Sequence, residues 1–320
     1  MVSIWETERP PSVQDYYLVC YFALAFPVAR FLLDCFLYQK LARWCIFPHG
    51  VKGLKNGARE AGEKKIPKFT ESAWKLTYYL ATEVFVIFIT YKEAWFGNTS
   101  AFWHGWPYQT VKFQLTLFYT FQCGFYIYSV AALLFWETRR KDFDVMMTHH
   151  IVTIGLIAYS YITGSFRAGS IVLALHDVSD VFMEAAKLCK YSGSEVGASV
   201  SFGLFVLSWV LLRLIYFPFW IIWSTSNYEI PEKLERTFAQ TLKMGRSTCC
   251  GGFWNVPEPI DDIAQHILQK HMISSLTVDC LVNTICGSAF CGVSSDLYGY
   301  QLRVQSTCRF ELCGGISSLL

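Results

Sequence analysis

The chain has 320 residues, of which 53% are hydrophobic and only 16% are charged, whereas an average soluble domain has about 25% charged residues. Its 27 lysines and arginines nearly balance its 25 aspartates and glutamates, so the net charge does not indicate nucleic-acid binding. Long apolar runs with few charges, and aromatic residues within and beside them, are typical of membrane spans. The composition therefore argues against a soluble enzyme, a disordered protein and a DNA-binding factor, and it predicts a multi-span membrane protein.

Six apolar stretches are long enough to cross about 30 Å of hydrocarbon. Each is expected to be helical, because lipid offers no partners for backbone polar groups. The last stretch contains a single charged residue, Arg213, and we expect a kink at Pro218. The expected fold class is an all-α polytopic membrane bundle. In chain order the predicted spans are residues 16–38, 74–96, 114–136, 146–163, 168–189 and 199–223.

Basic residues predict the orientation of these spans. Residues 40–68 contain eight lysines and arginines against two glutamates, which places this loop in the cytosol. The run Arg139-Arg140-Lys141 falls on the same side, and the N-terminus is then lumenal. The sequon Asn98-Thr99-Ser100 would also be lumenal, so Asn98 is a candidate glycosylation site.

The chain is expected to have three parts. Residues 1–70 hold the lumenal N-terminus, the first span and the basic loop, and residues 71–226 hold the helical bundle in which we expect the chemistry. Residues 227–320 form a tail rich in Cys, Ser and Gly. Seven cysteines crowd into this tail in a spacing that fits no zinc pattern, whereas the five earlier cysteines are interpreted as small apolar fillers.

Adjacent histidines lie within the fourth predicted span. His149 and His150 point about 100° apart on a helix, so they cannot face one cavity equally. One should reach the reacting centre, while the other supports it or packs against a neighbouring span. The alternative is that both are core residues with satisfied hydrogen bonds, and the ionisable residues of the fifth span weigh against it.

The fifth predicted span carries His176, Asp177 and Asp180 on one broad helical face, and Glu184 extends that face towards the cytosol. Buried carboxylates need counter-charges or protons, and we expect the histidines of the fourth span to be their partners. An imidazole held by a carboxylate suits a general base or a nucleophile. A metal site is the competing interpretation, because His, Asp and Glu are all metal ligands. Membrane di-iron oxygenases, however, need about eight histidines, whereas this chain has seven, and four of them lie outside the predicted spans. We therefore expect no metal ion.

Two groups of basic residues have several interpretations. Arg213 could neutralise the carboxylates of the fifth span, bind an anionic group of a substrate, or act as a structural counter-ion. Arg139, Arg140 and Lys141 lie at the cytosolic entrance to the fourth span and could attract a phosphorylated cofactor. Topology alone also accounts for that basic run, and we prefer that explanation.

Three stretches of the chain together resemble the ceramide synthases of the TLC-domain family, and their sequences look closest to the plant-type members. The first is Arg-Arg-Lys-Asp-Phe-Asp-Val-Met-Met-Thr-His-His, residues 139–150. The second is Leu-His-Asp-Val-Ser-Asp-Val-Phe-Met-Glu-Ala-Ala-Lys, residues 175–187. The third is Arg-Leu-Ile-Tyr-Phe-Pro-Phe-Trp, residues 213–220.

This resemblance implies a multi-pass enzyme of the endoplasmic-reticulum membrane that joins a fatty acyl-CoA to the amine of a sphingoid base, sphinganine or phytosphingosine. It implies His149 as base or acyl-accepting nucleophile and His150 as its support. Asp177 and Asp180 would orient imidazole or bind the ammonium and hydroxyl groups of the substrate, with His176 as a third member. Acyl-CoA would be a co-substrate rather than a bound cofactor. We expect membrane lipid around the protein, no nucleic acid, and a homo- or heterodimer.

The resemblance covers residues 16–226 and stops there. Family members have a seventh span, whereas residues 227–320 offer no good span, as an alternative transcript or a mistaken gene model would produce. This altered tail favours a second hypothesis, a non-catalytic TLC-type protein such as a lipid sensor, a lipid carrier or an inactive isoform paired with an active synthase. The histidines and aspartates favour the enzyme. A membrane hydroxylase is a weaker third hypothesis.

Overall fold

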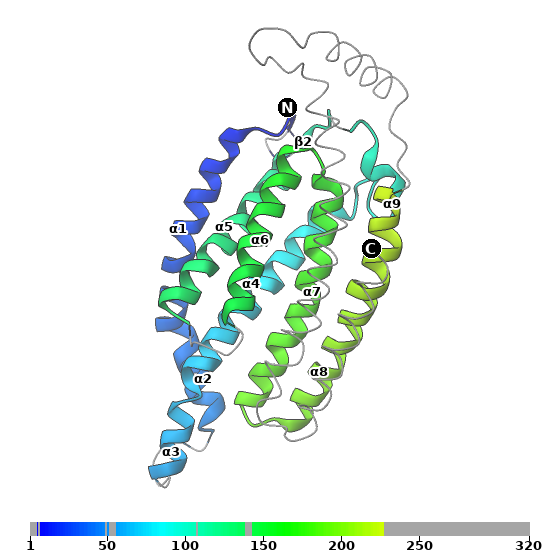
Figure 1. Ribbon diagram of the computed structural model, residues 1–320. Helices are drawn as coiled ribbons and strands as arrows, with labels where there is room; N and C mark the ends of the chain where they lie inside the picture. Colours follow the sequence, from blue (N-terminus) through cyan, green and yellow to red (C-terminus); the bar gives the residue numbers. More distant parts are fainter. Residues whose placement is uncertain are drawn as a thin grey trace, which may run out of the picture.

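The computed structural model describes residues 5, 7–48, 50, 56–106, 108–137 and 143–226 (Figure 1). Long helices lie side by side in this part of the chain. They are α1 (Tyr16–Leu33), α4 (Ile66–Thr90), α5 (Phe113–Phe135), α6 (Phe143–Ile162), α7 (Phe166–Tyr191) and α8 (Glu195–Trp209). The shorter elements are β1 (Glu8–Arg9), η2 (Val13–Asp15), η3 (Asp34–Tyr38), α2 (Gln39–Ile46), α3 (Asn56–Glu63), η4 (Thr99–Trp103), β2 (Val111–Lys112), η5 (Val210–Ile222) and α9 (Trp223–Ser226).

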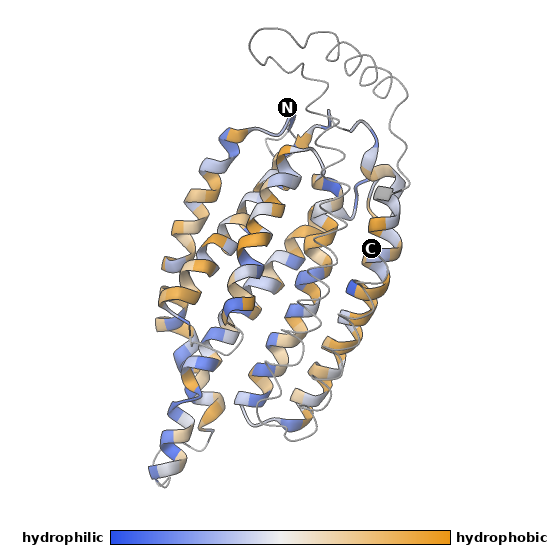
Figure 2. Cartoon of the chain, viewed as in Figure 1, coloured by the Kyte–Doolittle hydropathy of each residue, from blue (hydrophilic) through white to orange (hydrophobic). Residues whose placement is uncertain are grey.

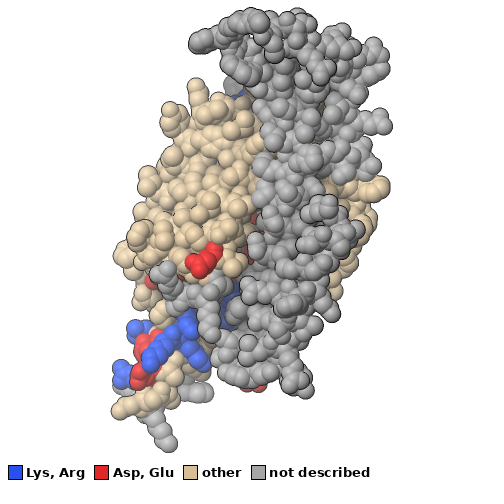
Figure 3. All heavy atoms as spheres, in the orientation of Figure 1, with Lys and Arg blue, Asp and Glu red and all other residues tan. Residues whose placement is uncertain are grey.

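The long helices alternate in direction, as expected for a chain that crosses a membrane repeatedly (Figure 1). α2, α3 and the turn between α7 and α8 lie at one end of the bundle. β1, β2 and η4 lie at the other end, where β1 and β2 pair as antiparallel strands. Figure 3 shows basic side chains gathered at the end that contains α2 and α3. The described part of the basic loop, residues 40–68, therefore lies at the same end as the turn between α7 and α8.

Four helical stretches in the described part are long and apolar enough to cross a membrane. They are Val13–Ile46, Phe113–Phe135, Phe143–Ile162 and Glu195–Ile222. The other two predicted spans correspond to α4 and α7, with 25 and 26 residues, or about 37–39 Å at ~1.5 Å per residue. Both contain several ionisable residues, and Figure 2 shows hydrophilic bands at intervals along α7. The all-α membrane bundle expected from the sequence is confirmed.

Two predicted spans differ clearly from the structure, one in where it begins and one in how its helix is wound. α4 begins at Ile66 rather than at residue 74, because Pro67 is tolerated in the first helical turn and the polar residues that follow remain helical. In the last span, Pro218 lies within a π-helical segment, η5, that begins at Val210. The chain is therefore wound as a π-helix over 13 residues around the proline.

Helix α7 occupies a central place, because α4, α6, α8 and η5 all pack against it. On the other side of the bundle α1 packs closely on α5 at Gly124. A Cβ atom at Gly124 would lie 2.7 Å from the Cβ of Phe22 and 3.1 Å from the backbone oxygen of Val19. Glycine thus allows the two backbones to approach. The packing of α4 and η5 on α7 places the ionisable residues of α7 between these two elements.

Candidate active site

Both histidines of α6 pack against the ring of Tyr126 on α5. The ring centroid of Tyr126 lies 5.5 Å from that of His150 and 6.4 Å from that of His149. His150 is buried, with 8% of its surface exposed, whereas His149 is only partly buried. The charge of His149 interacts with Arg213, and that of His176 interacts with His149. His149 is therefore the member of the pair that lies nearer to α7 and η5, and His150 is the more buried member.

His176 on α7 has a fixed tautomer. Its Nδ1 lies 2.7 Å from the carbonyl oxygen of Val172, one helical turn earlier. Because a carbonyl can only accept a hydrogen bond, Nδ1 carries the proton and Nε2 keeps its lone pair. The ring meets Phe217 edge-on at 5.7 Å between centroids. His176 can thus accept a proton or a hydrogen bond through Nε2.

Asp177 terminates a chain of hydrogen bonds that runs from α4 through α5 to α7. Tyr78 donates a short hydrogen bond to Oε1 of Gln122, and Nε2 of Gln122 donates to Oδ2 of Asp177 at 2.5 Å. Asp177 is only 1% exposed, and its second oxygen, Oδ1, has no hydrogen-bond partner among the described residues. The arrangement fixes the carboxylate while leaving one oxygen available to a ligand.

Asp180 is paired with a cation. Arg213 of η5 donates from Nη2 to Oδ1 of Asp180 at 3.0 Å and to the backbone carbonyl of His176 at 2.8 Å. Of the three roles considered for Arg213, this geometry favours neutralising a carboxylate of the fifth span. It also attaches η5 to the stretch of α7 that holds the other site residues.

One expectation about these residues was wrong. The carboxylates of α7 were expected to pair with the α6 histidines, but Gln122 and Arg213 hold Asp177 and Asp180 instead. The expectation failed because α5 and η5, rather than α6, supply the side chains that reach these two carboxylates. The histidines contribute an adjoining surface. Residues 139–141, the basic run at the start of the fourth span, lie outside the described residues.

Glu184 does not take part in this arrangement. It forms an ion pair with Lys187 at 2.7 Å within α7. A second cluster links the neighbouring helices: Glu137 contacts Lys75 at 2.7 Å and Arg30 at 3.4 Å. These pairs neutralise charges at the end of the bundle predicted to be cytosolic.

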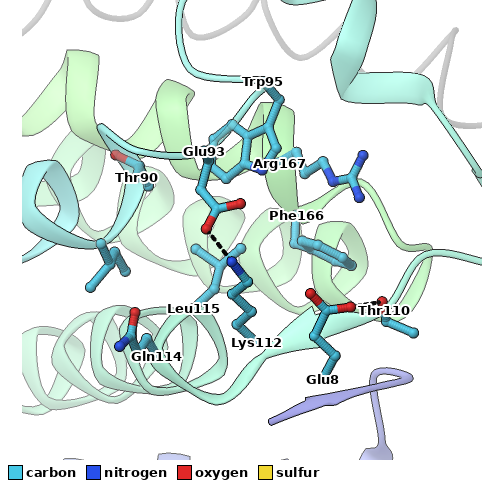
Figure 4. Close-up of a pocket in the computed structure, with 11 residues that line it drawn as sticks. Glu8, Thr90, Glu93, Trp95, Thr110, Lys112, Gln114, Leu115, Phe166 and Arg167 are labelled. Carbon is cyan, nitrogen blue, oxygen red and sulfur yellow. Dashed lines mark hydrogen bonds and ion pairs between the residues drawn. The ribbon is translucent and has the colours of Figure 1, made fainter. Parts of the chain in front are cut away.

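A pocket at the opposite end of the bundle contains none of the predicted site residues (Figure 4). Lys112 and Glu93 form an ion pair across it at 2.6 Å, and Glu8 accepts a hydrogen bond from Thr110 at 2.8 Å. Asn98 lies in the exposed loop at this end, at the N-cap of η4. The candidate glycosylation site is therefore on the end opposite α2 and α3.

Several residues that lie at the candidate site were not selected by sequence analysis. Gln122 and Tyr126 are uncharged and lie in an otherwise apolar stretch, so no pattern distinguishes them. Glu83 gave a signal that could have been used, because an acidic residue in the middle of a predicted span is itself a functional hypothesis. Among the described residues, no group of three or more His, Cys, Asp and Glu side chains is arranged to hold a metal ion.

Comparison with known proteins gives consistent matches. Residues 68–254 match the TLC domain. Ceramide synthase 1 LOH3 of Arabidopsis thaliana is 52% identical over 237 residues, which cover 72% of this chain and 76% of that protein. ASC1-like protein 3 of rice is 54% identical over 222 residues, covering 69% and 77%. Human ceramide synthase 5 is 38% identical over 160 residues, covering 50% and 41%.

Proposed function

Because this chain belongs to the TLC-domain family and is about half identical to plant ceramide synthases over three quarters of their length, we propose that it is a sphingoid-base N-acyltransferase. The reaction joins the acyl group of a fatty acyl-CoA to the amine of sphinganine or phytosphingosine and releases CoA. The observation that carries the proposal is this similarity to named ceramide synthases. The cluster of His149, His176, Asp177 and Arg213 on three packed elements supplies the chemistry the reaction needs.

The reaction requires a base and an oriented, water-poor site. A thioester is already activated, whereas the amine is mostly protonated at neutral pH and cannot attack until a base removes a proton. His149 is the candidate base or acyl-accepting nucleophile, because it is the α6 histidine whose charge interacts with Arg213 and His176. His150, packed on Tyr126, would hold the α6 pair in place.

The two aspartates take different roles in this proposal. Asp180 is neutralised by Arg213 and serves to position η5 against α7. Asp177 keeps one oxygen without a partner in the described residues and is the better candidate for contact with substrate. Arg139, Arg140 and Lys141 would attract the phosphates of CoA at the cytosolic entrance to α6. In this account the chemistry belongs to residues 71–226.

The proposed location is the endoplasmic-reticulum membrane with the N-terminus in the lumen. Basic residues of α2 and α3 at one end of the bundle, and Asn98 at the other, support this orientation (Figure 3). Apolar side chains exposed on α1 and α8, such as Leu24, Phe31, Val200 and Leu207, suit contact with lipid. Both substrates have long chains that could enter between such faces.

The test is ceramide formation in membranes from cells that lack their own ceramide synthases. Labelled sphinganine and a panel of acyl-CoAs are supplied to membranes containing the parent chain or His149→Ala, and products are measured by mass spectrometry. We expect ceramide from the parent and none from the variant. An inserted, well-expressed parent that forms no ceramide would refute the proposal and favour a non-catalytic TLC-type protein.

A further inference from the structure

Glu83 of α4 is a buried carboxylate that the mechanism above does not use. Only 6% of its surface is exposed, and neither carboxylate oxygen has a hydrogen-bond partner among the described residues. α4 packs against α7, and Tyr78 of α4 is joined to Asp177 through Gln122. Glu83 lies on the same helix, close enough to Asp177 for the two charges to interact. Oδ1 of Asp177 also lacks a partner within the described part of the chain. Two carboxylates thus present three unsatisfied oxygens in the interior of the bundle.

The neighbouring cations are paired with other carboxylates. Lys75 contacts Glu137 and Glu71, Lys187 contacts Glu184, and Arg213 contacts Asp180, all within the described residues. An ionised carboxylate away from water requires a counter-charge or several hydrogen bonds. Glu83 and Asp177 therefore form a site that suits a cation brought by a ligand.

We infer that Glu83 and Asp177 together bind the ammonium group of the sphingoid base. The inference rests on the proposed function and assigns Glu83 to substrate binding. An ammonium has three N–H donors and no acceptor, so it matches three carboxylate oxygens that lack donors. Asp177 is held in place by Gln122, and it adjoins His176 on α7, which in turn interacts with His149. A cation bound there would lie beside the stretch of α7 that carries His176, whose charge interacts with that of the candidate base.

Binding of a cation that cannot be acylated tests this inference. N,N-dimethylsphinganine carries the charge but cannot form the amide, whereas the matching long-chain 1,3-diol has a hydrogen in place of the amine. Both are measured as competitors of sphinganine on the parent chain and on Glu83→Gln, Glu83→Asp and Glu71→Gln. Glu71→Gln is the matched control, because it removes a buried carboxylate from the same helix while Lys75 keeps Glu137 as its partner.

We expect Glu83→Gln to weaken inhibition by the cation at least tenfold while inhibition by the diol and the KM for acyl-CoA stay within twofold. Glu83→Asp should keep the preference for the cation, and Glu71→Gln should match the parent. Equal changes for cation and diol, or no change for either, would overturn the inference. Failure of Glu83→Gln to accumulate while Glu71→Gln accumulates would also overturn it, because Glu83 would then serve folding. A parent chain that forms no ceramide would instead refute the proposed function.

Discussion

Arg213 and Asp180 form an ion pair, with 3.0 Å between Nη2 and Oδ1, that joins the π-helical segment η5 to α7. The same Nη2 donates to the backbone carbonyl of His176. One guanidinium thus neutralises the Asp180 carboxylate and holds η5 against the backbone of α7. Because π-helical segments are often found at functional sites, the irregular winding of η5 fits a role in placing Arg213. The pair leads to the first prediction.

Arg213→Met should leave Asp180 without a counter-charge inside the bundle. Breaking a fully buried pair costs about 3–5 kcal/mol, and partial exposure of both groups should reduce the loss to about 2 kcal/mol. We expect a lower melting temperature in detergent and at least a tenfold loss of ceramide formation. The double variant Arg213→Met/Asp180→Asn should regain part of the melting temperature. An unchanged melting temperature in Arg213→Met would contradict this account of the pair.

Gln122→Leu should disconnect Asp177 from Tyr78. The substitution preserves approximate size but removes the amide that satisfies both groups, at a cost of about 1–3 kcal/mol for the polar groups left unsatisfied. Tyr78→Phe removes only the first hydrogen bond and should have a smaller effect. Gln122→Leu should therefore lower the melting temperature and ceramide formation more than Tyr78→Phe does. A larger loss in Tyr78→Phe would argue against the chain of hydrogen bonds.

His149→Ala and His150→Ala should differ in kind. Loss of a general base typically lowers a rate by about 10²–10⁴-fold, so His149→Ala should lose activity while the fold is retained. His150 is the more buried and packs on Tyr126, so its removal should also lower the melting temperature. Paired measurements of kcat and thermal stability separate these effects. A fully active His149→Ala would assign the base elsewhere.

Gly124→Val should separate α1 from α5, because the added side chain meets Phe22 and the backbone of Val19. Overpacking of this kind costs about 1–3 kcal/mol. Gly155→Val on α6 is the matched control, since a Cβ atom there meets no atom within 4 Å apart from the nearby backbone of its own helix. The expected result is a lower melting temperature for Gly124→Val alone. Equal behaviour of the two variants would show that α1 and α5 do not pack as described.

Glycan addition at Asn98 tests the orientation. If the loop between α4 and α5 is lumenal, Asn98 should carry a glycan. Treatment with an endoglycosidase should then increase the gel mobility of the parent chain, whereas the gel mobility of Asn98→Gln should not change. A sequon engineered in the α7–α8 turn should remain unmodified. Modification of the turn instead would place the N-terminus in the cytosol.

The sequence predicts the helical bundle well because a membrane span needs a long apolar helix and few other solutions exist. It also singles out His149, His176, Asp177, Asp180 and Arg213 as candidate site residues, since ionisable residues are costly within spans. It does not predict which residues pair with them. Pairing depends on the rotation of each helix and on side chains such as Gln122, whose uncharged amide gives no signal in an apolar stretch.

The direct test of the central claim is acyl transfer by the purified chain in lipid vesicles. Vesicles contain either the parent or His149→Ala, after the two chains have been shown to have the same melting temperature. Isotope-labelled sphinganine and an acyl-CoA are added, and labelled ceramide and free CoA are measured together. The account predicts ceramide and CoA in equal amounts from the parent and neither from the variant. Labelled ceramide from both chains, or from neither, would contradict it.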